Sequence, residues 1–215
     1  MQITVREPGS ALTHFIGMIL AMFASMPVLI EVGRTGDQKA IIAITMFVLS
    51  MILLYGASTL YHSLNLTGKK LMLFKKLDHV MIFVLIAGTY TPVCVISLGG
   101  TVGYVLLAVV WGIALAGMLF KMLWVTCPKW VSSVLYISLG WACLSVFGKL
   151  FAVLPLAAFV WLLVGGIIYT VGGVIYALKL SIFNAKHKYF GSHEIFHLFV
   201  MAGSFCHLVC MYVIV

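Results

Sequence analysis

The sequence predicts an all-α membrane protein, a single bundle of seven transmembrane helices that occupies the whole chain, residues 1–215. Hydrophobic residues make up 64% of the 215 positions and charged residues only 8%. A soluble domain contains about 25% charged residues, so a water-soluble fold is excluded. A spanning helix needs about 20 apolar residues, so seven of them use roughly 65% of this chain, in agreement with its hydrophobic content.

The first three spans follow from apolar runs between charged loops. The first run is longer than the hydrophobic region of a signal peptide, and little positive charge precedes it, so we expect a retained helix. The second run begins after Arg34 and Lys39, and the third begins after Lys75 and Lys76. The expected ranges are 11–32, 40–62 and 77–98.

The last four spans are bounded in the same way by glycine, proline or lysine. Gly99 and Gly100 precede the fourth run, and Lys121 and Lys129 separate the fourth from the fifth. Pro155 precedes the sixth run, and a basic loop precedes the seventh. The expected ranges are 102–124, 131–148, 156–178 and 193–215.

The distribution of basic residues predicts the orientation of the bundle. With seven spans, ten of the thirteen lysine and arginine residues fall on the side of the N-terminus. Basic loops stay in the cytoplasm, so we expect a cytoplasmic N-terminus and an outside C-terminus. The ten are Arg6, Lys69, Lys70, Lys75, Lys76, Lys121, Lys129, Lys179, Lys186 and Lys188; the other three are Arg34, Lys39 and Lys149.

The net charge of +8 is expected to serve topology and contacts with lipid headgroups. Membrane lipids are therefore the expected partners, and nucleic acid is not. The sequence offers no support for a particular oligomeric state. The five cysteines form no CxxC pair and are expected to pack as small hydrophobic residues.

Ionisable and polar residues are expected to meet at one depth, near the cytoplasmic face. Polar groups inside a bilayer are costly and usually face the interior of the bundle. The second span ends there, the third and seventh begin there, and the first carries a histidine one turn inside. The residues concerned are Ser58, His62, Asp78, His79, His193, Glu194, His197 and His14.

Three of these histidines form a candidate zinc site. His193 and His197 are four residues apart, so both imidazoles face the same side of a helix, and His62 offers a third nitrogen from another helix. Three histidine ligands leave one tetrahedral position for water, as in catalytic zinc sites. The alternative is that these histidines form hydrogen bonds in the core or at the headgroup level.

Asp78 and Ser58 are the candidate catalytic residues. Asp78 is interpreted as a general base that holds a zinc-activated water, and Ser58, one turn from His62, as a group that points into the same cavity. Asp78 has the alternatives of capping a helix or pairing with a lysine. Ser58 has the alternatives of bonding its own helix or packing as a small residue.

The remaining histidines have weaker expectations. His207 lies about 21 Å deeper than His193 along a helix, too far to share its metal, and either satisfies a core hydrogen bond or marks a polar cavity. His14 is expected to line the pocket, and His187 to be solvated in a basic loop.

The segment His193-Glu-Ile-Phe-His197 also matches H-E-x-x-H, the pattern of zinc metalloproteases in which the glutamate, here Glu194, is the base. A membrane-embedded protease is therefore one interpretation. Because the pattern is short, it occurs often by chance.

Three separated motifs resemble a known family. They are Ser58-Thr-Leu-Tyr-His62; Lys76-Leu-Asp78 followed by Ala87-Gly-Thr-Tyr-Thr-Pro92; and His193-x-x-x-His197 with Gly203-Ser-Phe-Cys-His207. In this order they resemble the hemolysin III branch of the progestin and adipoQ receptor family, related to adiponectin receptors and more remotely to alkaline ceramidases.

The resemblance implies a zinc ion bound by His62, His193 and His197 near the cytoplasmic face, with Asp78 reaching it through water and Ser58 beside it. It gives Glu194 no support. The short chain is similar to the bacterial branch, which implies a bacterial plasma membrane, and hormone signalling is not implied.

Two functions remain open on the sequence alone. The first is a zinc-dependent hydrolase of a lipid amide or ester at the cytoplasmic leaflet, with Ser58 stabilising the oxyanion. The second is a non-enzymatic membrane sensor or a hemolysin III-type cytolysin in which zinc is structural.

Overall fold

The computed structural model describes residues 5–178 and 190–215. Within these ranges the chain is helical, without strands, and seven helical segments are long and apolar enough to cross a membrane. The seven-span prediction is therefore confirmed. Three basic residues of the orientation count, Lys179, Lys186 and Lys188, lie outside the described residues, as does His187.

Four of the seven spans are single helices, the first is divided at Ser25 into two α-helices, and the third and fifth contain a change of helix type. The first span consists of α1 (Pro8–Ala24) and α2 (Met26–Thr35). The second is α3 (Gln38–Ser63), and the third is α4 (Gly68–Pro92) with a π-helical turn, η1 (Val93–Leu98). The fourth is α5 (Gly100–Leu123); the fifth is α6 (Lys129–Gly140), the 3-10 segment η2 (Trp141–Val146) and α7 (Phe147–Val153); the sixth is α8 (Leu156–Leu178), and the seventh is α10 (Ser192–Ile214).

The third span begins nine residues earlier than its apolar run. Helix α4 starts at Gly68, so the four lysines at 69, 70, 75 and 76 lie on the helix and not in a loop. Lysine is a good helix former, and a helix continues beyond the hydrocarbon layer wherever its residues favour it. Asp78 therefore lies inside a helix, three turns from its start, and does not cap one.

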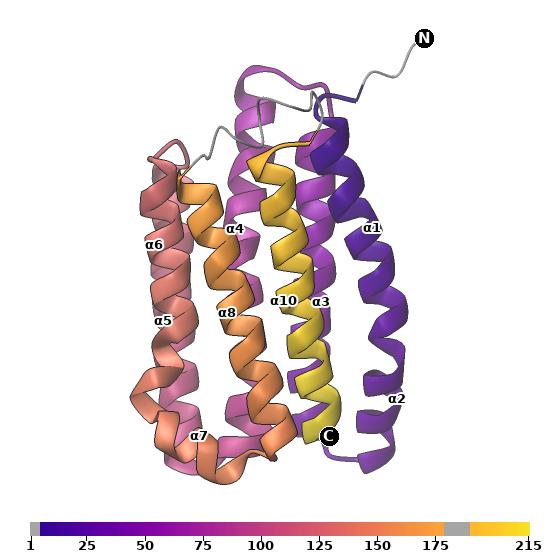
Figure 1. Cartoon of the computed structure of the whole chain (residues 1–215), viewed down its shortest axis with the longest axis vertical. Coiled ribbons are helices and arrows are strands. Elements are labelled where there is room, and N and C mark those ends of the chain that lie inside the picture. Colours follow the sequence, from indigo (N-terminus) through magenta and orange to yellow (C-terminus); the bar gives the residue numbers. More distant parts are fainter. Residues whose placement is uncertain (1–4, 179–189) are drawn as a thin grey trace.

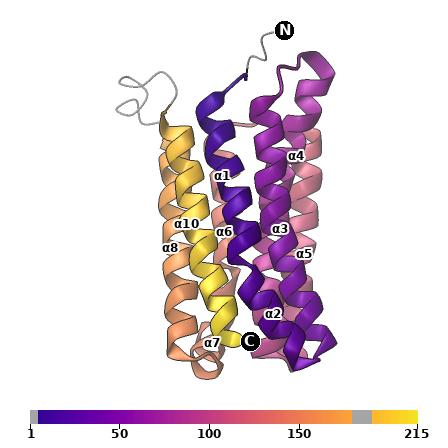
Figure 2. The same cartoon turned by 90° about the vertical axis from the view of Figure 1, so that its right-hand side faces the viewer.

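The seven spans stand side by side, and the two termini lie at opposite ends of the bundle (Figure 1). Helix α10 packs against α8 and α1, and α3 packs between α1 and α4. The view from the side shows the first span lying across α3 and α10 (Figure 2). The N-terminal ends of α1, α4 and α10 and the C-terminal end of α3 thus share one end of the bundle.

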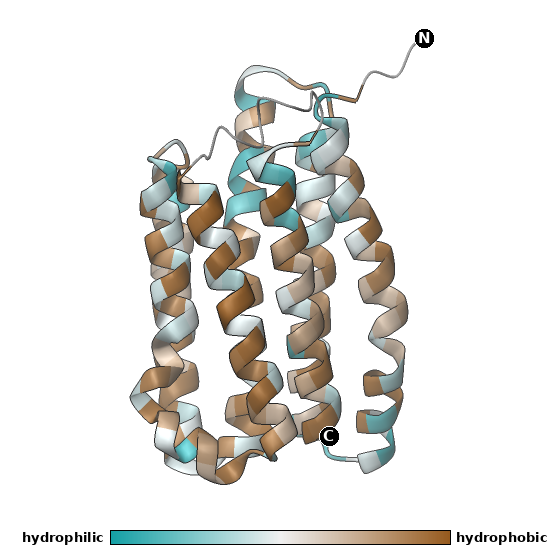
Figure 3. Cartoon of the chain, in the orientation of Figure 1, coloured by the Kyte–Doolittle hydropathy of each residue, from teal (hydrophilic) through white to brown (hydrophobic). Residues whose placement is uncertain are grey.

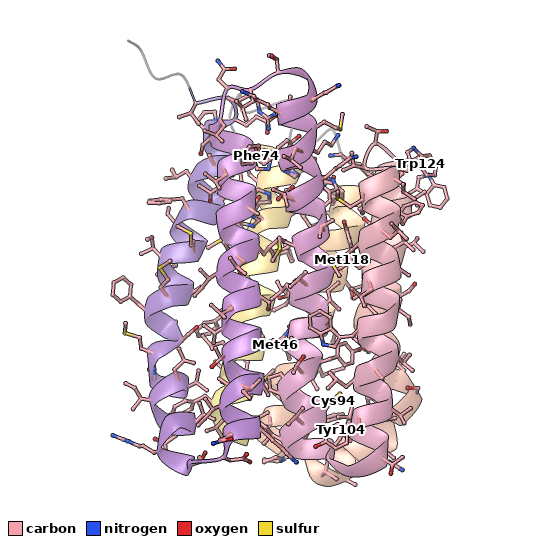
Figure 4. The ribbon with its side chains drawn as sticks, turned by 180° about the vertical axis from the view of Figure 1, so that it is seen from behind. Met46, Phe74, Cys94, Tyr104, Met118 and Trp124 are labelled. Atoms are coloured by element: carbon pink, nitrogen blue, oxygen red, sulfur yellow. The ribbon has the colours of Figure 1, made fainter. Side chains whose placement is uncertain are left out.

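The outer surface of the bundle matches the thickness of a bilayer. Tyr104 and Trp124 flank α5 at its two ends (Figure 4), and each is about half exposed. Twenty residues of helix separate them, or about 30 Å, which is the thickness of the hydrocarbon layer. Aromatic residues favour the two membrane interfaces, so these two side chains mark where the layer begins and ends.

Hydrophilic residues gather inside the bundle at the end that carries the N-terminus (Figure 3). In the same picture the middle of the bundle is largely hydrophobic. The polar residues that the sequence places at one depth therefore lie together at one end of the fold.

The fifth span is interrupted, and a tyrosine from α4 pairs with its free backbone groups. The hydroxyl of Tyr90 donates a hydrogen bond to the carbonyl of Gly140 (2.7 Å) and accepts one from the N–H of Cys143 (2.9 Å). Backbone groups without partners are costly in a membrane. This pairing allows the helix to change to the 3-10 form at residues 141–146.

Lys121 is fully buried, although the sequence counts it among the basic residues of a loop. Its ammonium donates hydrogen bonds to the hydroxyl of Ser132 (2.5 Å) and to the sulfur of Cys127 (3.1 Å). These bonds close the connection between α5 and α6. The five cysteines are free thiols.

Candidate metal centre and adjoining cavity

The structure brings together three histidines from two helices. His62 lies in the last turn of α3, and His193 and His197 lie in the first two turns of α10. One ring nitrogen of each lies within 4.8 Å of the others. The Nε2 atoms of His62 and His193 are 3.2 Å apart. These three side chains are called the histidine triad below.

The chain before α1 holds the end of α3 in place. The backbone N–H of Glu7 donates to the carbonyl of His62 (3.0 Å), and the N–H of Arg6 donates to the carbonyl of Ser63 (3.5 Å). The guanidinium of Arg6 also lies over the ring of Tyr61, 4.2 Å from its centroid. The last turn of α3, which carries His62, is therefore fixed by a segment outside the spans.

Two side chains from the first span and its approach set the direction of the histidine rings. Glu7 pairs with Nδ1 of His62, and the hydroxyl of Thr13 lies 3.0 Å from Nδ1 of His197. In each ring this leaves Nε2 for the triad. Histidine ligands of metals nearly always have such an outer partner, and a carboxylate is a common one.

The charge of Glu7 also depends on this contact. The hydrogen bond with His62 holds the pKa of the Glu7 carboxyl below its usual value. Glu7 is therefore a carboxylate at neutral pH. An anionic partner at Nδ1 makes the other nitrogen of an imidazole a better ligand.

His14 is a fourth histidine at the same end of the bundle. Its ring is buried and stacks on that of His197, with the centroids 3.6 Å apart. Neither of its nitrogens has a hydrogen-bond partner within the described residues. It lines the cavity described below, as the sequence predicts.

Asp78 lies beside the triad. It is buried, and its carboxylate lies 3.4 Å from Nδ1 of His79, which donates a hydrogen bond to the carbonyl of Lys75 (2.9 Å). It lines the same cavity as His193 and His197. Of the two alternatives left by the sequence, capping is wrong because the residue lies inside α4. The contact seen here is with a histidine.

Ser58 is completely buried one turn before His62. Its hydroxyl lies near the carboxylate of Asp78 and makes no hydrogen bond of good geometry to the protein. It does not belong to the wall of the cavity. Ser58 thus lies beside Asp78, and not in contact with the open space.

Glu194 is engaged away from the triad. Its carboxylate accepts hydrogen bonds from the hydroxyl of Ser10 and from the backbone N–H of Gly191, the latter at 2.7 Å. The second bond is a cap at the start of α10. These contacts do not favour Glu194 as the base of a metalloprotease.

A cavity of about 160 Å³ runs from the triad into the middle of the bundle. Asp78, His193 and His197 form its wall at one end, and Phe147, on the opposite half of the fifth span, reaches it from the other end. Most of the remaining wall consists of aliphatic and aromatic side chains. The cavity therefore suits an apolar occupant with a polar group at the triad.

The sequence missed two contacts of the site, those of Glu7 and Thr13. Both residues precede the apolar part of the first span, and no spacing rule connects them to His62 or His197. The sequence offered one indirect signal for Thr13. His14 is expected to line the pocket, and its neighbour Thr13 must lie at the same depth.

Comparisons with known proteins agree along the whole chain. A family model described as haemolysin-III related matches residues 2–208. The protein named Hemolysin-3 from Bacillus cereus is 38% identical over 210 residues, covering 98% of this chain and 92% of the relative. The Hemolysin-3 homolog from Bacillus subtilis (strain 168) is also 38% identical, covering 97% and 94%.

Proposed function

This chain belongs to the haemolysin-III-related family, as a multi-pass protein of the bacterial cell membrane, and we propose that it is a zinc-dependent hydrolase of lipid amide or ester bonds. The observation that carries the proposal is the position of Asp78 and two histidines of the triad, His193 and His197, in the wall of an apolar cavity. A hydrolase of lipids needs both parts, because the bond to be cleaved is polar and the chain attached to it is not.

The triad fits a zinc ion by its donor set. Three imidazole nitrogens lie within 4.8 Å of one another. Histidine nitrogens favour zinc over magnesium or calcium. Zinc bound there would act as a Lewis acid. Three histidine ligands would leave one position for a water molecule, whose pKa would fall to about 7.

Asp78 is the general base in this proposal. Its carboxylate takes a proton from the attacking water and returns it to the leaving amine or alcohol. Its position in the cavity wall allows it to meet both. Nδ1 of His79, which bonds the carbonyl of Lys75, lies 3.4 Å from this carboxylate.

Ser58 is a positioning residue for Asp78. Its hydroxyl lies near that carboxylate, and it is not part of the cavity wall. Its place beside the carboxylate and outside the cavity wall supports this role better than contact with the substrate oxyanion, the role expected from the sequence.

Hydrolysis of defined lipids tests the proposal. Purified protein in lipid vesicles is given an N-acyl amide lipid or a glycerophospholipid ester, and released fatty acid is measured by mass spectrometry. We expect release from one of the two, loss on chelation, and recovery with zinc. Glu31→Gln, in an ion pair at the opposite end of the bundle from the triad, is the control. A zinc-loaded protein that releases no fatty acid from either lipid would contradict the proposal.

A second candidate function follows from the names of the relatives, both of which are described as hemolysins. In that case zinc ties α3 to α10, and the protein lyses cells or senses a ligand without turnover. Lysis of erythrocytes by the wild type, equal to lysis by Asp78→Asn, would favour this candidate.

A further inference from the structure

A histidine in the middle of the bundle has one nitrogen without a partner. His207 is buried in the second half of α10 and lines the cavity. Its Nε2 lies 3.2 Å from the carbonyl oxygen of Leu162, and its Nδ1 is buried with no hydrogen bond to the described residues. A buried polar atom without a partner costs free energy, so a group outside the protein is expected to satisfy it.

The bond to Leu162 decides what that group must be. A carbonyl oxygen is an acceptor only, so Nε2 of His207 carries the proton. A neutral imidazole with its proton on Nε2 has an unprotonated Nδ1, which is an acceptor. The missing partner is therefore a hydrogen-bond donor.

The position of the ring is built into the fold. A Cβ atom at position 165 would lie 2.5 Å from both Cδ2 and Nε2 of His207. Because Gly165 has none, the ring packs directly against α8 and reaches the Leu162 carbonyl. This close contact leaves the ring little freedom to turn.

Other polar side chains of the cavity wall already have partners. The hydroxyl of Thr89 donates to the carbonyl of Leu85 (2.9 Å), and that of Thr170 donates to the carbonyl of Gly166 (2.7 Å). The hydroxyls of Tyr169 and Ser204 pair with each other at 2.7 Å. Within the described residues, Nδ1 of His207 is thus the unsatisfied nitrogen farthest from the triad in this wall.

We propose that His207 accepts a hydrogen bond from a hydroxyl group carried on the hydrocarbon chain of the lipid that occupies this cavity. The proposal rests on the proposed function for the place of the lipid's head, at the triad. Ten residues of helix separate His197 from His207, about 15 Å. An extended chain with C–C bonds of about 1.5 Å advances about 1.25 Å per carbon, so the hydroxyl lies near the twelfth carbon.

The proposal is tested by binding, without turnover. Full-length protein in detergent is titrated with stearic acid, 12-hydroxystearic acid and 5-hydroxystearic acid, competing with a fluorescent fatty acid. Each is measured on the wild type, on His207→Leu, which removes the acceptor, and on His207→Asn, which offers another. Thr89→Val is the matched control, a polar wall residue of similar depth on α4 whose hydroxyl is already used.

We expect the ratio of 12-hydroxystearate to stearate affinity to fall about three- to tenfold in His207→Leu, the range for one neutral hydrogen bond. Asparagine should recover part of it, and Thr89→Val should leave it unchanged. The wild type should also prefer the 12-hydroxy over the 5-hydroxy isomer. That comparison needs no variant. Both isomers carry one hydroxyl, so the free energy of removing it from water is the same and cancels.

Two results would overturn the inference in different ways. If stearate binds but the wild type binds the two hydroxy isomers equally well, then His207 recognises no hydroxyl group. A water molecule at Nδ1 would have this effect. If none of the three acids binds, the lipid cavity itself is wrong, and the proposed function fails with it.

Discussion

The rings of His14 and His197 lie face to face, 9° from parallel, and join the first span to the last. Thr13, the neighbour of His14, meets the same ring at its edge through Nδ1. Two consecutive residues of α1 therefore fix one triad histidine by its face and by its edge. The first span, which carries no triad residue, determines how His197 points.

Metal content is the first prediction. Replacing His62, His193 or His197 by alanine should remove most bound zinc in each case, because two remaining nitrogens hold it poorly. His207→Ala should keep its zinc. Elemental analysis of protein purified without chelators measures this. Substoichiometric zinc in the wild type would show that the triad is no zinc site.

The second prediction separates the two candidate bases. Asp78→Asn should retain zinc and lose hydrolysis, because the proton acceptor is gone. Glu194→Gln should keep both, since Glu194 bonds Ser10 and the start of α10. Zinc content and fatty-acid release are measured on the same preparations. The opposite pattern would assign the base to Glu194.

The third prediction concerns the outer partner of His62. Glu7→Gln should weaken zinc binding about 10- to 100-fold, the usual effect of losing such a partner. Competition with a zinc-binding dye measures the affinity. Glu31→Gln, which removes a carboxylate paired with an arginine far from the triad, should change nothing. Equal zinc affinities of the wild type and Glu7→Gln would leave Glu7 with no role at the metal.

The fourth prediction tests the packing of α4 against α5. A Cβ atom at position 117 would lie 2.3 Å from the ring of Phe83, whereas one at position 112 meets nothing within 4 Å. Gly117→Ala should therefore lower the free energy of unfolding by about 1–3 kcal/mol. Gly112→Ala, on the same helix, should not lower it. Thermal melting in detergent compares the two.

The fifth prediction is the orientation of the bundle. A reporter at Val215 should lie outside the cytoplasm, and one near Lys186 inside, because ten of thirteen basic residues favour that arrangement. Single cysteines at positions 69 and 149, both exposed, should label from opposite sides. Labelling from one side only would also contradict seven spans.

The spans were predictable because each apolar run has the length that a bilayer requires, and this signal depends on composition alone. The start of α4 was not predictable, because its first nine residues are helical yet include four lysines. The change of the fifth span to the 3-10 form at residues 141–146 was not predictable either. It depends on the hydroxyl of Tyr90, which meets residues about 50 positions away in the sequence.

The triad was predictable for a similar reason. His193 and His197 follow a helical spacing, and His62 lies at a span end that must share their depth. The contacts of Glu7 and Thr13 depend instead on how the chain before the first span folds over α3 and α10. The acceptor role of Nδ1 of His207 was not predictable, because it follows from the bond between Nε2 and Leu162 on another helix. That bond forms because Gly165 has no side chain.

The oxygen atom of Tyr90 determines how much sequence change the fifth span tolerates. Phenylalanine has nearly the same shape, yet at this position it would leave the carbonyl of Gly140 and the N–H of Cys143 bare. In hydrocarbon each bare group costs several kcal/mol. A substitution that looks conservative would thus force residues 141–146 back towards a regular helix. The shape of the fifth span therefore depends on a side chain of the third.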